Sequence, residues 1–326
     1  MNVIPVSVIV CTYNRAAFLP NVISQLCAQD YPKDSFEIII VDNRSSDDTP
    51  QTVQRFIPTC GLTLRYVREN RPGVTNARNC GAAEARYPYL AYLDDDCSVG
   101  VDWLSQLISG FGLAEQVSVV AGRVALDYDG QKVPSWLGSK SERWLADFNF
   151  PGSQPRLLEN PVYVCEGNMA ITHEAWRAVG GFLGMDQFSS PHMASQEIVY
   201  LLEQVKRRGG KVAFIPAAVA HHHTAIPTQG RMLMRAYWHG VSDGTLDYLL
   251  RRFSRVSAIF RSALDAAAMF VFLFLSFFSL LVFNKADSMY HLLRAAARLG
   301  RVLSGLRLAG DWRRARLWLL THAVRF

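Results

Sequence analysis

The chain of 326 residues is long enough for about two domains with a sizeable core, and half of its residues are hydrophobic. Charged residues make up only 19%, which excludes a disordered or solvating chain. The net charge of +6 is uneven: residues 1–230 carry 19 basic and 23 acidic residues, whereas residues 231–326 carry 15 and 5. The basic segment also contains the most hydrophobic run, so it favours a membrane surface over nucleic acid as a partner.

The order of the predicted elements in the first 121 residues indicates the fold class. Apolar, β-branched runs predict buried strands, and the segments between them predict helices. Strands are expected at residues 7–11, 37–41, 62–67, 89–93 and 117–121, and helices at 18–28, 48–56, 73–85 and 101–111. This alternation predicts an α/β fold with a doubly wound, mostly parallel sheet and helices on both faces, which binds ligands at the carboxyl ends of its strands.

The remainder of the acidic part of the chain is less regular, because prolines interrupt residues 122–165. The expected elements are a helix at 173–179, a loop at 180–194, a helix at 195–208 capped by Ser195, and a short strand at 212–215. We expect the loop, which is rich in glycine, serine and methionine, to act as a lid over a ligand.

The cysteines and the N-terminus indicate the compartment. No two cysteines form a C-x-x-C pair, which argues against a zinc or thioredoxin-like site. We expect free, mostly buried thiols in a reducing environment. Residues 1–15 lack the basic start of a signal peptide, so we expect this part of the chain in the cytosol. The six cysteines are Cys11, Cys27, Cys60, Cys80, Cys97 and Cys165.

Three consecutive aspartates, Asp94, Asp95 and Asp96, directly follow the strand predicted at residues 89–93. Adjacent carboxylates repel one another, and a divalent cation removes this repulsion because Mg²⁺ and Mn²⁺ prefer carboxylate oxygen. For an isolated run of this kind, a solvated acidic turn or a helix cap is the commoner outcome.

Two neighbouring strand ends are also polar, at residues 12–15 and 42–48. The carboxyl ends of parallel strands meet at one edge, so these acids, amides and aromatic ring should gather there. A nucleobase needs a stacking face and hydrogen-bond partners, a ribose needs a carboxylate, and a diphosphate needs a metal. The three strand ends together therefore predict a nucleotide pocket.

Six segments follow one another between about residues 5 and 223: VSVIVCTYNR, EIIIVDNRSSDDT, NRPGVTNARNCGAAEA, YLDDDC, CEGNMAITHEAWRAVGGF and the helix after Ser195. In this order and spacing the chain resembles the family 2 glycosyltransferases of the GT-A fold. The resemblance implies an enzyme of the hexosyltransferase class that uses a nucleotide-diphosphate sugar, by family habit a UDP-sugar. It also implies transfer to an acceptor hydroxyl with inversion, and dependence on Mn²⁺ or Mg²⁺.

The resemblance further implies roles for individual residues, which fall into three groups. The nucleotide contacts are Thr12, Tyr13, Arg15, Asp42, Arg78 and Asp94; the acceptor-side contacts are Glu166, Gly167 and Asn168; the metal ligands are Asp96 and Asp94.

The catalytic base is where the sequence departs from the family pattern. Relatives commonly place Glu-Asp at the start of the helix after the glycine-rich loop, with the Asp as base, whereas this chain has Gln196-Glu197. The register assigns the base to Glu197, and Asp186 in the loop is the alternative. A third possibility is that Glu197 only complements the charge of the helix N-terminus.

Three consecutive histidines, His221, His222 and His223, follow the last predicted strand. Imidazole is a good ligand for Mn²⁺ and a donor to phosphate. Because alternate residues share a face, we expect His221 or His223 to complete the metal or pyrophosphate site.

The C-terminal part of the chain, residues 231–326, is predicted to be helical and membrane-associating. Its hydrophobic segment, 263–283, contains 18 uncharged residues at 266–283, which just meets the length of a transmembrane helix. Residues 289–308 repeat leucine and arginine at helical spacing, which suits an anionic lipid surface. The hydrophobic segment could span the bilayer, lie in its interface, or be buried in the protein.

We therefore expect a GT-A catalytic domain at residues 1–230 on the cytoplasmic face of a membrane and a basic helical region at 231–326. The expected acceptor is a saccharide or a lipid-linked glycan of polysaccharide biosynthesis. The alternatives are a nucleotidyltransferase, which should carry a glycine-rich phosphate loop that CTYNRAAF lacks, and a membrane-tethered protein that only binds sugar nucleotides.

Overall fold

The computed structural model describes residues 3–145, 150, 152–159, 164–183, 197–251 and 255–310. The chain divides into two compact units. The first unit comprises Met1–Asp129, Ala146–Gly184 and Glu197–Thr224 and contains the sheet. The described parts of the second unit are residues 130–145, 225–251 and 255–310.

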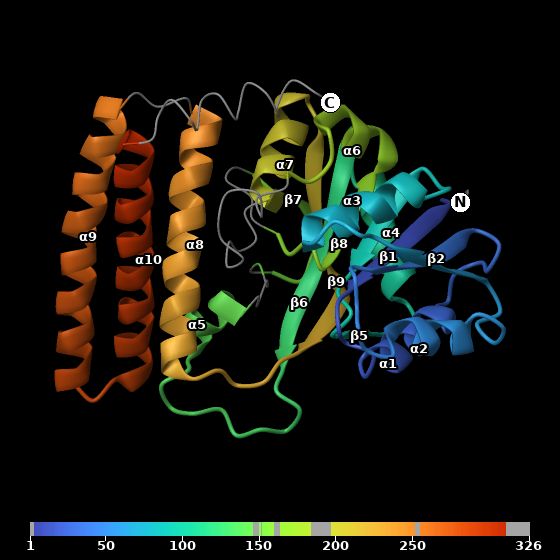
Figure 1. Cartoon of the computed structure of the whole chain (residues 1–326), viewed down its shortest axis with the longest axis horizontal. Coiled ribbons are helices and arrows are strands. Elements are labelled where there is room, and N and C mark those ends of the chain that lie inside the picture. The colour runs from blue at the N-terminus through green and yellow to red at the C-terminus, as the bar shows by residue number, and fades with distance from the viewer. Residues whose placement is uncertain are drawn as a thin grey trace. The chain divides into compact units, whose positions relative to one another are not determined.

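The first unit alternates strands and helices as predicted (Figure 1). Its elements are β1 (Val6–Thr12), α1 (Leu19–Cys27), β2 (Phe36–Asp42), α2 (Thr49–Phe56), β3 (Thr63–Arg68), α3 (Val74–Glu84), β4 (Tyr89–Leu93), β5 (Cys97–Val99), α4 (Trp103–Ser109), the 3₁₀ turn η1 (Gly110–Gly112), β6 (Val117–Asp127), β7 (Arg156–Leu157), β8 (Asn168–Thr172), α6 (His173–Val179), α7 (Glu197–Arg207) and β9 (Lys211–His223).

The sheet has the order β3-β2-β1-β4-β8-β6-β9-β5, with β7 also paired to β9, among the described residues. Strands β3, β2, β1 and β4 are parallel, as are β6 and β9. Strand β8 is antiparallel to both β4 and β6, and β5 and β7 are antiparallel to β9. The predicted α/β class is confirmed, and antiparallel strands join its parallel half to the rest of the sheet.

Helices cover both faces of the sheet, as predicted from the apolar runs. One core cluster joins side chains of α1, α2 and α4 to one face, including Leu26, Val53 and the fully buried Trp103. The other joins α3 and α7 to the opposite face, including Ala82 and Leu201. Burial on both faces explains why β1 and β2 are nearly continuous hydrophobic runs.

Strand β9 is longer than predicted and carries the three histidines. The predicted strand ended at Ile215, and the next residue, Pro216, cannot donate a ladder hydrogen bond. In the structure, residues 216–218 form an irregularity opposite β6, and pairing resumes from Val219 opposite Arg123 to His223 opposite Asp127. A bulge accommodates the proline and lets both strands extend to the edge of the sheet.

The predicted set of free cysteines is wrong for two of the six residues. Cys27 at the end of α1 and Cys60 after α2 form a disulfide, with their Cα atoms 5.3 Å apart. No local pattern indicates this bond, because 33 positions separate the two cysteines and only the packing of α1 beside α2 brings them together. The other four cysteines are free, and Cys97 and Cys165 are buried.

The described part of the second unit contains three long helices, and α10 packs against both α8 and α9 (Figure 1). Its elements are α5 (Ser139–Glu142), the 3₁₀ turn η2 (Arg143–Leu145), α8 (Gln229–Arg251), α9 (Arg255–Leu281) and α10 (Lys285–Gly310). Within the described part of the chain, one helical segment is long and apolar enough to cross a membrane: Ile259–Leu281, with a mean hydropathy of 2.2.

Candidate functional site

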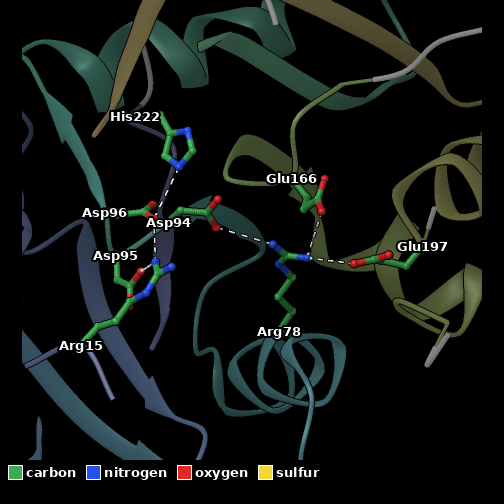
Figure 2. Close-up of polar contacts among 8 residues, drawn as sticks. All are labelled: Arg15, Arg78, Asp94, Asp95, Asp96, Glu166, Glu197 and His222. Carbon is green, nitrogen blue, oxygen red and sulfur yellow. Dashed lines mark hydrogen bonds and ion pairs between the residues drawn. The ribbon is translucent and has the colours of Figure 1, made fainter. Parts of the chain in front are cut away.

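The candidate site lies in the first unit, at the carboxyl ends of β1, β2 and β4. The register pairs Thr12 at the end of β1 with Asp42 at the end of β2, and β4 runs beside β1 in the same direction. The acidic run Asp94–Asp96 therefore leaves the sheet at the same edge as the other two polar strand ends. Figure 2 shows two groups of charged side chains there, one around Arg15 and one around Arg78.

The first group joins Arg15 to the acidic run. Its Nη1 atom donates to Asp95 Oδ1 at 2.8 Å and to Asp96 Oδ2 at 2.6 Å. His222 Nε2 lies 3.4 Å from Asp96 Oδ2 on the other side (Figure 2). The structure places the Arg15 guanidinium on the aspartates, and its expected contact with the nucleobase stays a prediction.

Burial and charge shift the two carboxyl groups in opposite directions. Burial raises the pKa of Asp95 to about 6, although Arg15 opposes the rise. Burial also acts to raise the pKa of Asp96, but hydrogen bonding to His222 and the charges of His222 and Arg15 outweigh it and lower the pKa. Asp96 is therefore the better anionic ligand of the two.

Asp96 also has the features of a ligand for a divalent cation. Its Oδ1 atom is buried and has no hydrogen-bond partner among the residues that the structure describes. A buried, unpartnered carboxylate oxygen is costly, and a bound cation removes that cost. The carboxylate oxygen suits Mg²⁺ or Mn²⁺, and the neighbouring imidazole nitrogen favours Mn²⁺ of the two.

The second group has the buried guanidinium of Arg78, from α3, at its centre (Figure 2). Nη1 lies 3.3 Å from Glu166 Oε1 and 3.3 Å from Glu197 Oε1, and Nη2 lies 3.5 Å from Asp94 Oδ1. Burial acts to lower the pKa of Arg78, but the three carboxylates outweigh it and raise the pKa. One fixed positive charge thus gathers side chains that lie up to 119 positions apart in the sequence.

The carboxylates around Arg78 differ in their exposure. Glu166 and Glu197 are buried, whereas the side chain of Asp94 is 38% exposed and can meet a ligand. Burial raises the pKa of Glu166 to about 7; Arg78 lowers it, and the neighbouring Glu197 and Asp94 raise it further. Glu166 therefore holds a proton until near neutral pH.

Gly167 and Asn168 have structural reasons for their identities. A Cβ atom on Gly167 would lie 2.0 Å from Asp94 Oδ2, so only glycine permits this approach of the two segments. Asn168 is fully buried: its amide donates to the carbonyls of Arg123 and Ala218 and accepts from Trp103 Nε1. These hydrogen bonds join strands, and the expected acceptor contact of Asn168 stays a prediction.

Of the expected nucleobase residues, Tyr13 is exposed, whereas Thr12 and Asp42 are buried. Asp42 accepts hydrogen bonds from Ser45 N at 2.7 Å and from the Tyr66 hydroxyl at 2.6 Å, which fix its carboxylate at the end of β2. The exposed Tyr13 ring offers the stacking face that a base requires.

The histidines take a different arrangement from the predicted one. Because His222 pairs with Cys97 across the β5–β9 ladder, it is His222 that faces Asp96, rather than His221 or His223. His223 turns to the other face, where Nδ1 lies 2.8 Å from Asp129 Oδ1 and Nε2 lies 2.8 Å from Ser98 Oγ. With Asp127 and Asp129, His223 could hold a cation apart from Asp96.

Sequence reasoning missed His222 and also Phe182, whose ring centroid lies 5.7 Å from the guanidinium carbon of Arg78. The period-two alternation would have selected His222 if the register of β9 on β5 had been known. Asp186 and Ser195, with residues 184–194 of the expected lid, lie outside the described residues.

Comparison with known proteins identifies the family of the chain. The model of the family "Glycosyl transferase family 2" matches residues 7–179, which is more than half of the chain. Glycosyltransferase AglE of Haloferax volcanii is 33% identical over 126 residues, which cover 38% of this chain and 40% of that protein. The chain thus matches less than half the length of this relative.

Two further similarities cover more of the chain. The glucosyl-dolichyl phosphate glucuronosyltransferase of Haloferax volcanii is 23% identical and covers 75% of this chain and 78% of that protein. The fold matches that of the mannosyltransferase PcManGT from Pyrobaculum calidifontis, solved in complex with GDP-Man and Mn²⁺, with a TM-score of 0.57 and 19% identity over 99% of this chain and 80% of that one.

Proposed function

The chain belongs to glycosyl transferase family 2, and we propose that it transfers a hexosyl group from a nucleotide-diphosphate sugar to an acceptor hydroxyl with inversion at the anomeric carbon. The observation that carries the proposal is the pair of charged groups at the strand ends, one built on Arg15 and the other on Arg78. Together they offer three carboxylates: Asp96 as an anionic ligand for a cation, Asp94 as an exposed group, and Glu197 as a buried group at the start of α7.

The donor would lie along the ends of β1, β2 and β4. Tyr13 provides a stacking surface for the base, Asp42 and Thr12 border it, and the exposed carboxylate of Asp94 accepts hydrogen bonds from ribose or sugar hydroxyls. The complex of PcManGT with GDP-Man supports a nucleotide-sugar donor. We propose a UDP-sugar, following the family resemblance.

The metal that the family implies fits this site, with Asp96 and His222 as its ligands. When bound, Mn²⁺ or Mg²⁺ would offset the negative charge of the departing nucleoside diphosphate. The unpartnered Asp96 Oδ1 supports this assignment, as does the Mn²⁺ in the structure of PcManGT. We place His222 in the role that the sequence assigned to His221 or His223.

Glu197 is the proposed catalytic base. It opens α7, and its carboxylate lies 3.3 Å from Arg78 Nη1, which holds it where it could accept a proton from the acceptor hydroxyl. Arg78 is a positioning residue, since it reaches the acceptor only through the carboxylates. Glu166, with its raised pKa, would hold a proton in the same site near neutral pH.

We propose a lipid-linked glycan as the acceptor and the cytoplasmic face of a membrane as the location. The support for this acceptor comes from the glucuronosyltransferase of Haloferax volcanii described above. Its name gives glucosyl-dolichyl phosphate, a lipid-linked sugar, and the match covers 75% of this chain. The excess of basic residues in 231–326 and the apolar helix at Ile259–Leu281 support membrane association.

A donor screen tests the reaction. UDP- and GDP-sugars are incubated with the full chain, with Mn²⁺ or with chelator, and release of nucleoside diphosphate is measured with and without a polyprenyl-phosphate-linked sugar. Release that needs both cation and acceptor is expected. Donor binding without transfer to any acceptor would instead support the binding-protein alternative.

Variants then test the base. Glu197→Gln should lower kcat by about a hundredfold or more while donor binding is kept. The control is Glu203→Gln on the same helix, where Glu203 is part-exposed and forms an ion pair with Arg207; it should retain activity. Full activity of Glu197→Gln would remove Glu197 from this role and favour Asp186.

A further inference from the structure

Helix α9 exposes an apolar face from Ile259 to its C-terminal end. Every exposed side chain from Ile259 to Phe283 is apolar. Phenylalanines contribute many of these exposed side chains, and Phe274 is 66% and Phe283 91% exposed. Besides these two, the face includes Phe270, Phe277, Phe278 and Leu281.

The inward side of α9 has the opposite character. Its buried side chains in this stretch are Ser262, Asp265, Ser276 and Ser279. Ser276 Oγ donates to the Ser288 carbonyl of α10 at 3.1 Å, and Asp265 pairs with Arg298 and Arg301 of α10. A helix with polar groups inside and apolar groups outside inverts the pattern of a helix that faces water.

The contact between α8 and α10 is of a kind frequent in membranes. Cβ atoms on Gly240 and Gly300 would lie 1.8 and 2.1 Å from carbonyl oxygens of the facing helix, so the two backbones touch. Gly244 follows Gly240 by four residues, and Ser304 follows Gly300 by four. Small residues at this spacing are typical of helices that pack in lipid.

From these contacts we propose that α9 lies within one leaflet of an anionic bilayer, along the membrane plane, without crossing it. This inference rests on the membrane association proposed above and specifies its geometry. The occupant of the α9 face is lipid, because hydrocarbon requires no hydrogen bonds, whereas a protein interface carries about one per 100–200 Å². The balance of +10 over residues 231–326 complements anionic headgroups.

The other helices explain why α9 stays in one leaflet. Alone across the bilayer, α9 would lose α10 and leave the Asp265 carboxylate in hydrocarbon. Crossing together with α10 and α8 would also carry the exposed Arg231 and Arg235 of α8 into lipid. An in-plane position buries the apolar face and keeps these charges in water.

Flotation with vesicles tests the surface. The full chain is mixed with vesicles of phosphatidylcholine, or of equal parts phosphatidylcholine and phosphatidylglycerol, without sugar nucleotide. The parent should float with the anionic vesicles, and the double variant Phe274→Asp/Phe277→Asp should bind them about a hundredfold less. The control Met234→Asp replaces an apolar residue that is 56% exposed on α8, and should float as the parent does.

The oligomeric state separates lipid from a second copy. Light scattering without lipid should give the same mass for parent and double variant. Equal flotation of the parent and the double variant would overturn the proposal. It would also be overturned if the parent is a dimer, the double variant is a monomer, and the two still float equally. Because this readout needs no catalysis, a failure of the proposed reaction would leave it unaffected.

Thiol labelling tests the in-plane geometry. Lys285→Cys places a thiol at the exposed start of α10, and the protein is added to preformed sealed vesicles. A membrane-impermeant maleimide should label it before detergent is added, above the background of the parent's own cysteines. Labelling only after detergent would show that the α9–α10 turn has crossed the bilayer and would overturn the proposal.

Discussion

Replacing Glu166 by glutamine should change how stability depends on pH. Burial holds the pKa of Glu166 at about 7 in the folded protein, against 4.5 for an ordinary glutamate. Below pH 4.5 the group is protonated in both folded and unfolded chains and favours neither. As the pH rises from 4.5 to 7, the unfolded chain loses this proton and the folded protein keeps it, so the free energy of unfolding falls.

The size of the effect follows from the difference between the two pKa values. At 1.36 kcal/mol for each pKa unit, the parent loses about 3 kcal/mol between pH 4.5 and pH 7 through this one group. Glu166→Gln cannot titrate, so its stability relative to the parent should rise by about 3 kcal/mol across the same interval. The altered contact with Arg78 could also lower the free energy of unfolding of the variant by a constant amount. Such a loss would displace the curve of the stability difference against pH without changing its slope.

The assay is urea unfolding of parent and variant from pH 4.5 to pH 8, in chelator. Titrating groups that do not interact with Glu166, including Asp95, contribute equally to both proteins and cancel in the difference. Glu115→Gln, at an exposed position, is the matched control and should give a flat difference curve. A flat curve for Glu166→Gln as well would refute the buried, proton-holding state of Glu166.

The remaining predictions concern stability and geometry. Asn168→Ala removes hydrogen bonds to Trp103 Nε1 and to two strand carbonyls and should cost about 3–6 kcal/mol in urea unfolding; unchanged stability with a raised acceptor KM would mean acceptor contact instead. Gly167→Ala should displace the Asp94 carboxylate and lower kcat/KM about a hundredfold with little change in melting temperature. Reducing the Cys27–Cys60 disulfide should cost about 3–4 kcal/mol for a loop of 33 residues, and mass mapping without reductant should recover the linked peptides.

Local patterns were sufficient to predict the parallel half of the sheet. The β-branched runs that form β1 and β2 are apolar along most of their length. Their buried polar side chains Ser7 and Glu37 satisfy each other, because Ser7 Oγ donates a hydrogen bond to Glu37 Oε1 at 2.8 Å. Polar residues begin where each strand leaves the core. The position of Asp94–Asp96 at the functional edge could therefore be read from the sequence.

Features that depend on pairing between distant segments could not be predicted in this way. The choice among the histidines depends on the register of β9 against β5, which the irregularity at residues 216–218 sets. The assembly around Arg78 joins α3, the turn before β8 and the start of α7. Motif order identified these residues, but not that a single guanidinium holds them together.

The charge of the assembled site explains why a cation and the donor belong together. The eight residues drawn in Figure 2 comprise five carboxylates, two arginines and one histidine, so the fully ionised carboxylates outnumber the arginines. Protons offset part of this excess, because burial raises the pKa of Asp95 to about 6 and that of Glu166 to about 7. A nucleoside diphosphate is itself anionic and would be repelled by the remaining charge. Donor affinity should therefore depend strongly on a divalent cation at Asp96, and the dependence should grow as the pH rises and these protons leave.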